Sequence, residues 1–137
     1  VSAHHAAGLY SVFHVRWDSG REATAAYLSG SGRGIGPWED TMLDLETGRE
    51  FVLSSEDADV EARRLTTADF PAGLREAWPQ DDRGRPITPG LRDSGPCVDP
   101  PALRRIARKG LTLRPQISLF AAAPARRGRQ RNGAAAS

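Results

Sequence analysis

The chain has 137 residues, of which 39% are hydrophobic and 26% are charged, a composition typical of one globular domain of ordinary size. No apolar run approaches the roughly 20 residues that cross a bilayer, and the first residues lack the features of a signal peptide, so we expect neither a membrane anchor nor export. The single cysteine, Cys97, excludes an internal disulfide and a cysteine-based zinc site, and a reducing, cytoplasmic setting is the default expectation.

Charge is distributed unevenly along the sequence. Residues 1–100 contain 17 acidic and 10 basic side chains, a net charge of −7, whereas residues 101–137 contain 9 basic side chains and no acidic one. Lys109 is the only lysine among these cations. An excess of arginine is typical of phosphate recognition, because the guanidinium fork matches a phosphate. It also follows from a GC-rich coding bias, and the abundant alanine, glycine and proline favour that second explanation.

The clearest strand pattern covers residues 9–17. It alternates between an apolar face of Phe13, Val15 and Trp17 and a polar face of His14 and Arg16, as a half-buried strand requires. Turn residues at 18–21 predict that residues 22–28 return as the second arm of a β-hairpin.

A second hairpin is predicted from residues 41–45 and 50–53, joined by the turn at 46–49. A helix is expected over residues 56–65, because acidic side chains lie in its first turns and arginines in its last, matching the helix dipole at both ends. A second short helix is expected over residues 69–78, where apolar side chains recur at helical spacing.

Residues 79–101 are predicted to be a linker or an extended arm, because nine of these 23 residues are Pro or Gly. We therefore divide the chain into a domain at 7–78, this linker, and a basic segment at 102–137. Within the basic segment, Asp99 is expected to cap a helix that begins at Pro100, and residues 121–137 are expected to be disordered in isolation. The predicted fold class is α+β, a small antiparallel sheet of two β-hairpins with two short helices, followed by the linker and a partly helical to disordered tail.

Two motifs that the sequence suggests at first sight are not supported by its residues. Glycines alternate over residues 30–36, but neither the dinucleotide fingerprint nor a P-loop follows from their spacing, and a flexible loop is the preferred interpretation. A helix-turn-helix over residues 101–120 is disfavoured, because Pro115 interrupts the second helix and Lys109 stands where an apolar residue should pack. No part of the chain resembles a known family.

Candidate catalytic groups lack local partners. His4 and His5 are adjacent and cannot chelate as a helical pair would, and His14 stands alone on the polar face of its strand. The carboxylates at 57, 59 and 61 have the pattern of solvated helix charges, and Cys97 has no histidine nearby in sequence. We therefore assign no catalytic residue, no metal ligand and no cofactor.

The sequence favours a non-enzymatic, small regulatory or nucleic-acid-associated protein whose basic segment makes electrostatic, sequence-tolerant contacts with the phosphates of DNA or RNA. The candidate contact residues are the nine cations of that segment: Arg104, Arg105, Arg108, Lys109, Arg114, Arg126, Arg127, Arg129 and Arg131. One alternative is a protein-interaction module whose basic tail contacts an acidic partner, with a homo-oligomer also open. A second alternative is a small enzyme that uses His14 or an acidic pair.

Overall fold

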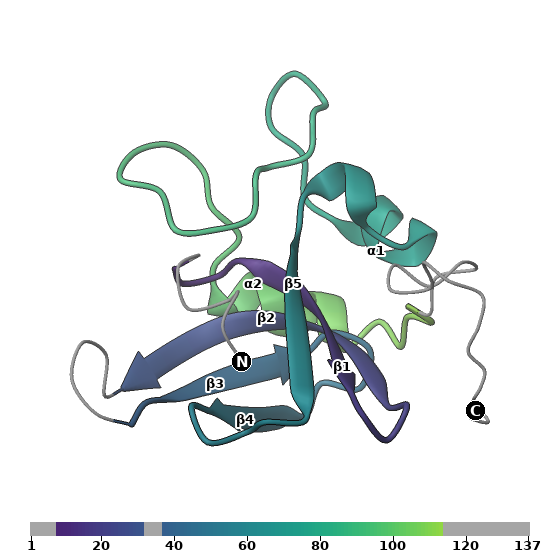
Figure 1. Cartoon of the computed structure of the whole chain (residues 1–137). Helices are drawn as coiled ribbons and strands as arrows, with labels where there is room; N and C mark the ends of the chain where they lie inside the picture. The colour runs from purple at the N-terminus through teal and green to yellow at the C-terminus, as the bar shows by residue number, and fades with distance from the viewer. Residues whose placement is uncertain (1–7, 32–36, 114–137) are drawn as a thin grey trace.

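The computed structural model describes residues 8–31 and 37–113. Its strands form an antiparallel sheet in the order β4-β3-β2-β1-β5, and the helices follow the sheet in sequence (Figure 1). The elements in chain order are β1 (Val12–Trp17), β2 (Glu22–Ser31), β3 (Glu39–Asp44), β4 (Glu50–Ser54), β5 (Val60–Leu65), the 3-10 turn η2 (Thr67–Asp69), α1 (Ala72–Ala77) and α2 (Pro100–Ala107). The predicted α+β class with a small antiparallel sheet is confirmed.

Both predicted hairpins are present, and their turns show why. In the β1–β2 turn, Gly20 takes a φ of +95° and its N–H donates to the carbonyl of Trp17 at 2.9 Å. In the β3–β4 turn, the Asp44 carboxylate accepts from the backbone N–H groups of Glu46 and Thr47 at 2.8 and 3.2 Å. Aspartate and glycine are the residues that stabilise such turns.

The predicted helix over residues 56–65 is wrong, because residues 60–65 form the edge strand β5. This strand pairs with β1 along its whole length, from Val12 opposite Leu65 to Trp17 opposite Val60. The pairing satisfies backbone groups of β1 that would otherwise lie unpaired at a sheet edge. Tertiary pairing therefore overrides the helical charge pattern, as it often does for short segments.

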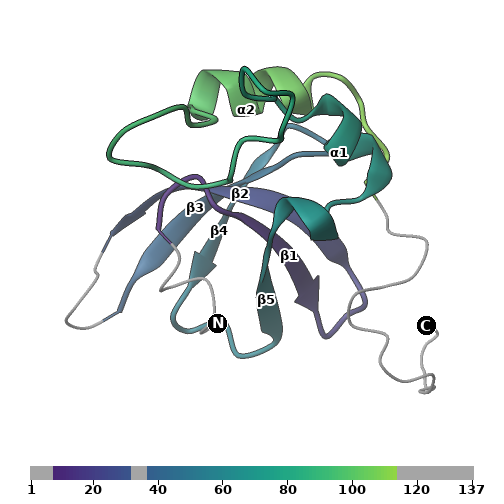
Figure 2. The same cartoon turned by 90° about the horizontal axis from the view of Figure 1, so that it is seen from above.

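One face of the sheet is covered by both α-helices, which Figure 2 shows side by side on it. The predicted helix over 69–78 is present in a shorter form as α1, and α2 begins after Asp99 as expected. The buried residues of this cluster come from the sheet, both helices and the segments around them: Val12, Ala26, Leu43, Leu45, Leu65, Phe70, Leu74, Trp78, Val98, Leu103, Ile106 and Leu113. The helices and the sheet thus share one apolar cluster.

On the opposite face, strands that are not neighbours in the sheet approach one another because the sheet twists. Its buried cluster draws on all five strands and comprises Phe13, Val15, Ala25, Tyr27, Met42, Leu53 and Ala62. The rings of Trp17 on β1 and Phe51 on β4 meet edge to face with centroids 5.6 Å apart, although two strands separate β1 from β4 in the sheet. The sheet is therefore strongly curled, and β1 is buried on both faces, not half-buried as the sequence predicts.

The segment between α1 and α2 makes two long excursions (Figure 1) and is attached to the rest of the fold at several points. The indole N–H of Trp78 donates to the carbonyl of Ile87 at 2.7 Å, and the N–H of Leu91 donates to the carbonyl of Leu9 at 2.8 Å. Val98 is buried in the cluster beneath the helices. The domain boundary near Trp78 stays a prediction, and this packing provides a direct test of it.

No helix within residues 8–31 and 37–113 is long and apolar enough to cross a membrane.

Candidate nucleic-acid interface

The helix α2 fixes the position of the first basic residues of the C-terminal segment. Its N-terminus is set by Asp99, whose carboxylate accepts from the backbone N–H of Ala102 at 3.1 Å, and by Pro100 at the first helical position. Leu103, Ile106 and Ala107 on the inner side are buried. This burial orients the helix, so that its opposite side must face solvent.

One predicted contact residue, Arg105, lies on that outer side, and Arg108 and Lys109 follow at the C-terminal cap and in the turn after the helix. Arg105, Arg108 and Lys109 are exposed, and none of them has an ion-pair or hydrogen-bond partner for its side chain within the described part of the chain. Arg105 and Arg108 are three positions apart, so their side chains are neighbours on the helix surface. Cations at a helix C-terminus also stabilise the helix dipole, so the same position suits a structural role.

Arg104 differs from these three residues, because its guanidinium forms an ion pair with Glu50 of β4 at 2.8 Å. Both side chains are a little under half exposed. The pair ties α2 to the sheet and leaves Arg104 less available to a phosphate than its neighbours. The five remaining predicted contact residues lie outside the described residues: Arg114, Arg126, Arg127, Arg129 and Arg131.

His14 is not on a solvent-facing side of the sheet, which corrects the expectation of a polar face. Its residue surface is only 1% exposed, and its Nε2 lies 2.7 Å from a carboxylate oxygen of Glu22 on β2. The carboxylate that a catalytic histidine would need is therefore beside it. However, the hollows around residues 80–96 are lined by neither residue, so the pair faces none of them. His4 and His5 lie outside the described residues.

The carboxylates at 57, 59 and 61 are not gathered into an acidic pair. Asp57 accepts from the backbone N–H of Ser54 at 2.8 Å, and Glu61 pairs with Arg16 at 3.3 Å on the exposed surface. Within residues 8–31 and 37–113, no three or more His, Cys, Asp or Glu side chains are grouped so that they could hold a metal ion. Cys97 is a free thiol in the segment before α2.

The tryptophans are engaged within the fold. Trp78 is buried, while Trp17 is partly buried and carries the guanidinium of Arg21 over its ring at 4.3 Å. Trp38 is also partly buried, and its backbone N–H donates to the hydroxyl of Ser55 at 3.2 Å. The alternating glycines at 30–36 fall mostly outside the described residues.

Sequence reasoning missed one arrangement of charged side chains. Arg85 and Arg92, seven positions apart in the segment expected to be a linker, line the same hollow. An aspartate at position 81, a few residues before Arg83 and Arg85, is a sequence signal for a turn around its side chain. The approach of Arg92 to Arg85 depends on tertiary packing and has no such signal.

Comparisons with known proteins give no further information on function. No family model, no curated protein and no solved structure matches the chain.

Proposed function

We propose that the protein is a non-enzymatic, regulatory or nucleic-acid-associated protein of the cytoplasm that binds the phosphates of DNA or RNA through α2 and the basic segment after it. The observation that carries this proposal is the exposure of Arg105 on α2 and of Arg108 and Lys109 at its C-terminal end, while the inner side of the helix is buried. These cations have fixed positions, carry no partner within residues 8–31 and 37–113, and begin a segment that contains no acidic residue.

The mechanism is the release of counterions from nucleic acid. Each cation that neutralises a phosphate frees a condensed counterion, which favours binding at low salt and lowers affinity as salt rises. Cations that contact the phosphate backbone carry no sequence information, because base identity is read at the base edges in the grooves. Binding should therefore tolerate any sequence.

The test is the salt dependence of binding to a generic DNA duplex, measured by fluorescence anisotropy on the full chain. If about six to nine cations engage, the log–log salt slope should be roughly −5 to −8, at about −0.9 per neutralised phosphate. Replacing Arg105, Arg108 and Lys109 together by Gln should weaken binding and flatten the slope by roughly 2 to 3 units. The matched control replaces Arg16, Arg49 and Arg83 by Gln, which removes the same charge elsewhere.

If the two triple variants flatten the salt slope by the same amount, only the net charge of the protein matters, and the proposal is contradicted. An unchanged affinity in the α2 variant would do the same. Binding to an acidic protein without binding to DNA or RNA would support the interaction-module alternative instead. A second variant, with Arg126, Arg127, Arg129 and Arg131 changed to Gln, measures the share contributed by the end of the chain.

A further inference from the structure

We propose that the loop between α1 and α2 holds a binding site for the phosphate group of a small organic phosphate ester. The site is a hollow of about 380 Å³ between two arms of that loop, residues 81–88 and 92–96. We call it the loop hollow. Its volume lies within the range of about 300–1,000 Å³ that small-molecule pockets occupy. The proposal is independent of the nucleic-acid function, because it uses other residues and another class of ligand.

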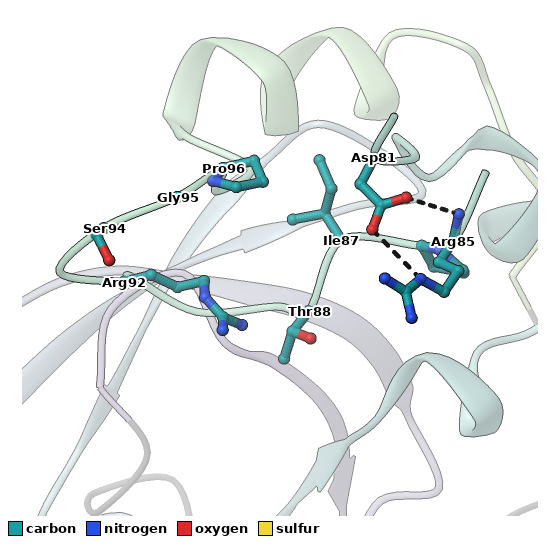
Figure 3. Close-up of a pocket in the computed structure, with 9 residues that line it drawn as sticks. Asp81, Arg85, Ile87, Thr88, Arg92, Ser94, Gly95 and Pro96 are labelled. Atoms are coloured by element: carbon teal, nitrogen blue, oxygen red, sulfur yellow. Dashed lines mark hydrogen bonds and ion pairs between the residues drawn. The ribbon is translucent and has the colours of Figure 1, made fainter. Parts of the chain in front are cut away.

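Hydrogen-bond donors reach the loop hollow from both arms. Arg85 and Thr88 come from the first arm, and Arg92 and Ser94 from the second. Figure 3 shows the side chains of Arg85 and Arg92 on either side of Thr88. Two guanidinium groups and two hydroxyls in different directions suit a tetrahedral phosphate with several acceptor oxygens better than a planar carboxylate with two.

The loop hollow contains more positive than negative side chains. Its charged residues are Arg85, Arg92 and Asp81. Asp81 is occupied by the loop itself, since its Oδ1 accepts from the backbone N–H groups of Arg83 and Arg85, each at 2.9 Å. Those backbone hydrogen bonds, with that of Arg85 the stronger influence, lower the pKa of the Asp81 carboxyl below its ordinary value, so it stays ionised near neutral pH.

Both arginines have donors left for a ligand. The guanidinium of Arg85 is only loosely paired, with its Nε 3.7 Å from the other Asp81 oxygen, and its side chain is 66% exposed. For Arg92 the described residues provide no ion-pair or hydrogen-bond partner at all. The adjoining hollows add Arg64 with Asp93, and Arg83 with Asp82, which balance each other. Arg92 also lines the hollow of Arg64 and Asp93, so the three hollows together hold four arginines and three aspartates, an excess of one positive charge.

The first arm is held in place before any ligand binds, and the second is anchored at its ends, where the N–H of Leu91 donates to the carbonyl of Leu9 at 2.8 Å and Val98 is buried. The N–H of Ile87 donates to the carbonyl of Pro79 at 3.0 Å, and the indole of Trp78 binds the carbonyl of Ile87. Gly90 has a φ of +119°, which only glycine adopts without strain, and a Cβ there would lie 3.5 Å from the Ser11 hydroxyl. Such preorganisation reduces the entropy lost when a ligand binds.

The rest of the lining is apolar, with Ile87, Pro86 and Pro96 beside the polar groups. A pocket of this kind binds an organic group next to the anion. The ligand class is therefore a phosphate ester with an apolar substituent, and bare phosphate should bind more weakly than such an ester.

The experiment is an NMR titration of the full chain at constant ionic strength with phenyl phosphate, inorganic phosphate and benzoate as probes. Phenyl phosphate should bind most tightly and shift the amide signals of Thr88, Ser94 and Gly95. Arg92→Gln should weaken its binding about tenfold, the loss expected for one charge-assisted hydrogen bond. Arg49→Gln removes an exposed arginine that lines none of these hollows and should leave the affinity unchanged.

Arg92 is exposed, so the variant should keep the amide spectrum of the folded protein. Equal weakening by Arg92→Gln and Arg49→Gln would overturn the proposal, as would benzoate binding at least as tightly as phenyl phosphate. The triple variant of Arg105, Arg108 and Lys109 should bind phenyl phosphate normally. Loss of binding in that variant would place the anion site on α2 and not in the loop hollow.

Discussion

Replacing Leu103 by alanine should destabilise the whole fold. Leu103 lies on the inner side of α2, is 0% exposed, and belongs to the cluster that contains Val12, Leu45 and Trp78. The substitution removes three buried carbon atoms, which accounts for about 2.5 kcal/mol at about 0.8 kcal/mol each. The cavity left behind adds to this, so a loss of about 3 to 4 kcal/mol is expected, within the range of about 2–5 kcal/mol for such changes.

Thermal and urea unfolding measure this effect. A loss of about 3 kcal/mol should lower the thermal midpoint by about 10 °C or more in a domain of this size. Arg105→Ala, on the exposed side of the same helix, is the control and should change stability by no more than about 0.5 kcal/mol.

The same measurement tests the predicted boundary at Trp78. If residues 7–78 were the stable unit, Leu103→Ala would leave the main unfolding transition unchanged. A change below about 1 kcal/mol would therefore refute the packing argument and support the boundary.

Truncation of the chain after Pro101 is a poorer test of nucleic-acid binding than replacement of the cations by Gln. The truncation also removes Leu103, Ile106 and Leu113 from the core.

Two further predictions concern the loop between the helices. Trp78→Phe should destabilise the protein by about 1–3 kcal/mol, because the partly buried carbonyl of Ile87 loses its donor, and amide exchange should speed up in residues 79–91 more than in β3. Asp81 has a pKa lowered from 3.8 in the folded protein, so its contribution to stability is present above that pH and lost as the pH falls through the lowered pKa. Unfolding of Asp81→Asn should therefore depend less on pH between about pH 5 and 2, and an unchanged pH profile would show that these hydrogen bonds do not stabilise the loop.

Local patterns predicted the elements whose causes are local. The hairpins follow from alternation and from turn residues such as Gly20 and Asp44, and α2 follows from Asp99, two prolines and one apolar stripe. The charge pattern of residues 56–65 has a local meaning too, but pairing with β1 prevails over it.

The remaining features depend on contacts between distant residues. His14 is buried because both faces of β1 are covered, which the alternation alone does not reveal. The prolines and glycines of residues 79–101 correctly indicate turns, yet they do not show that Val98 enters the core or that Arg92 lines the same hollow as Arg85. Among the four predicted contact residues that the structure describes, the pairing of Arg104 with Glu50 is a feature that the sequence alone does not reveal.

The position of β1 has a consequence for synthesis of the protein. Val12 is among the first described residues to leave the ribosome, yet it shares its cluster with Leu103 and Leu113. The apolar face of β1 is therefore not fully covered until about 100 further residues have been translated. At about 5–20 residues per second, that exposure lasts roughly 5 to 20 seconds. We expect folding to finish only after the helices have emerged, and the nascent hairpins to be the part of the chain that needs chaperone protection.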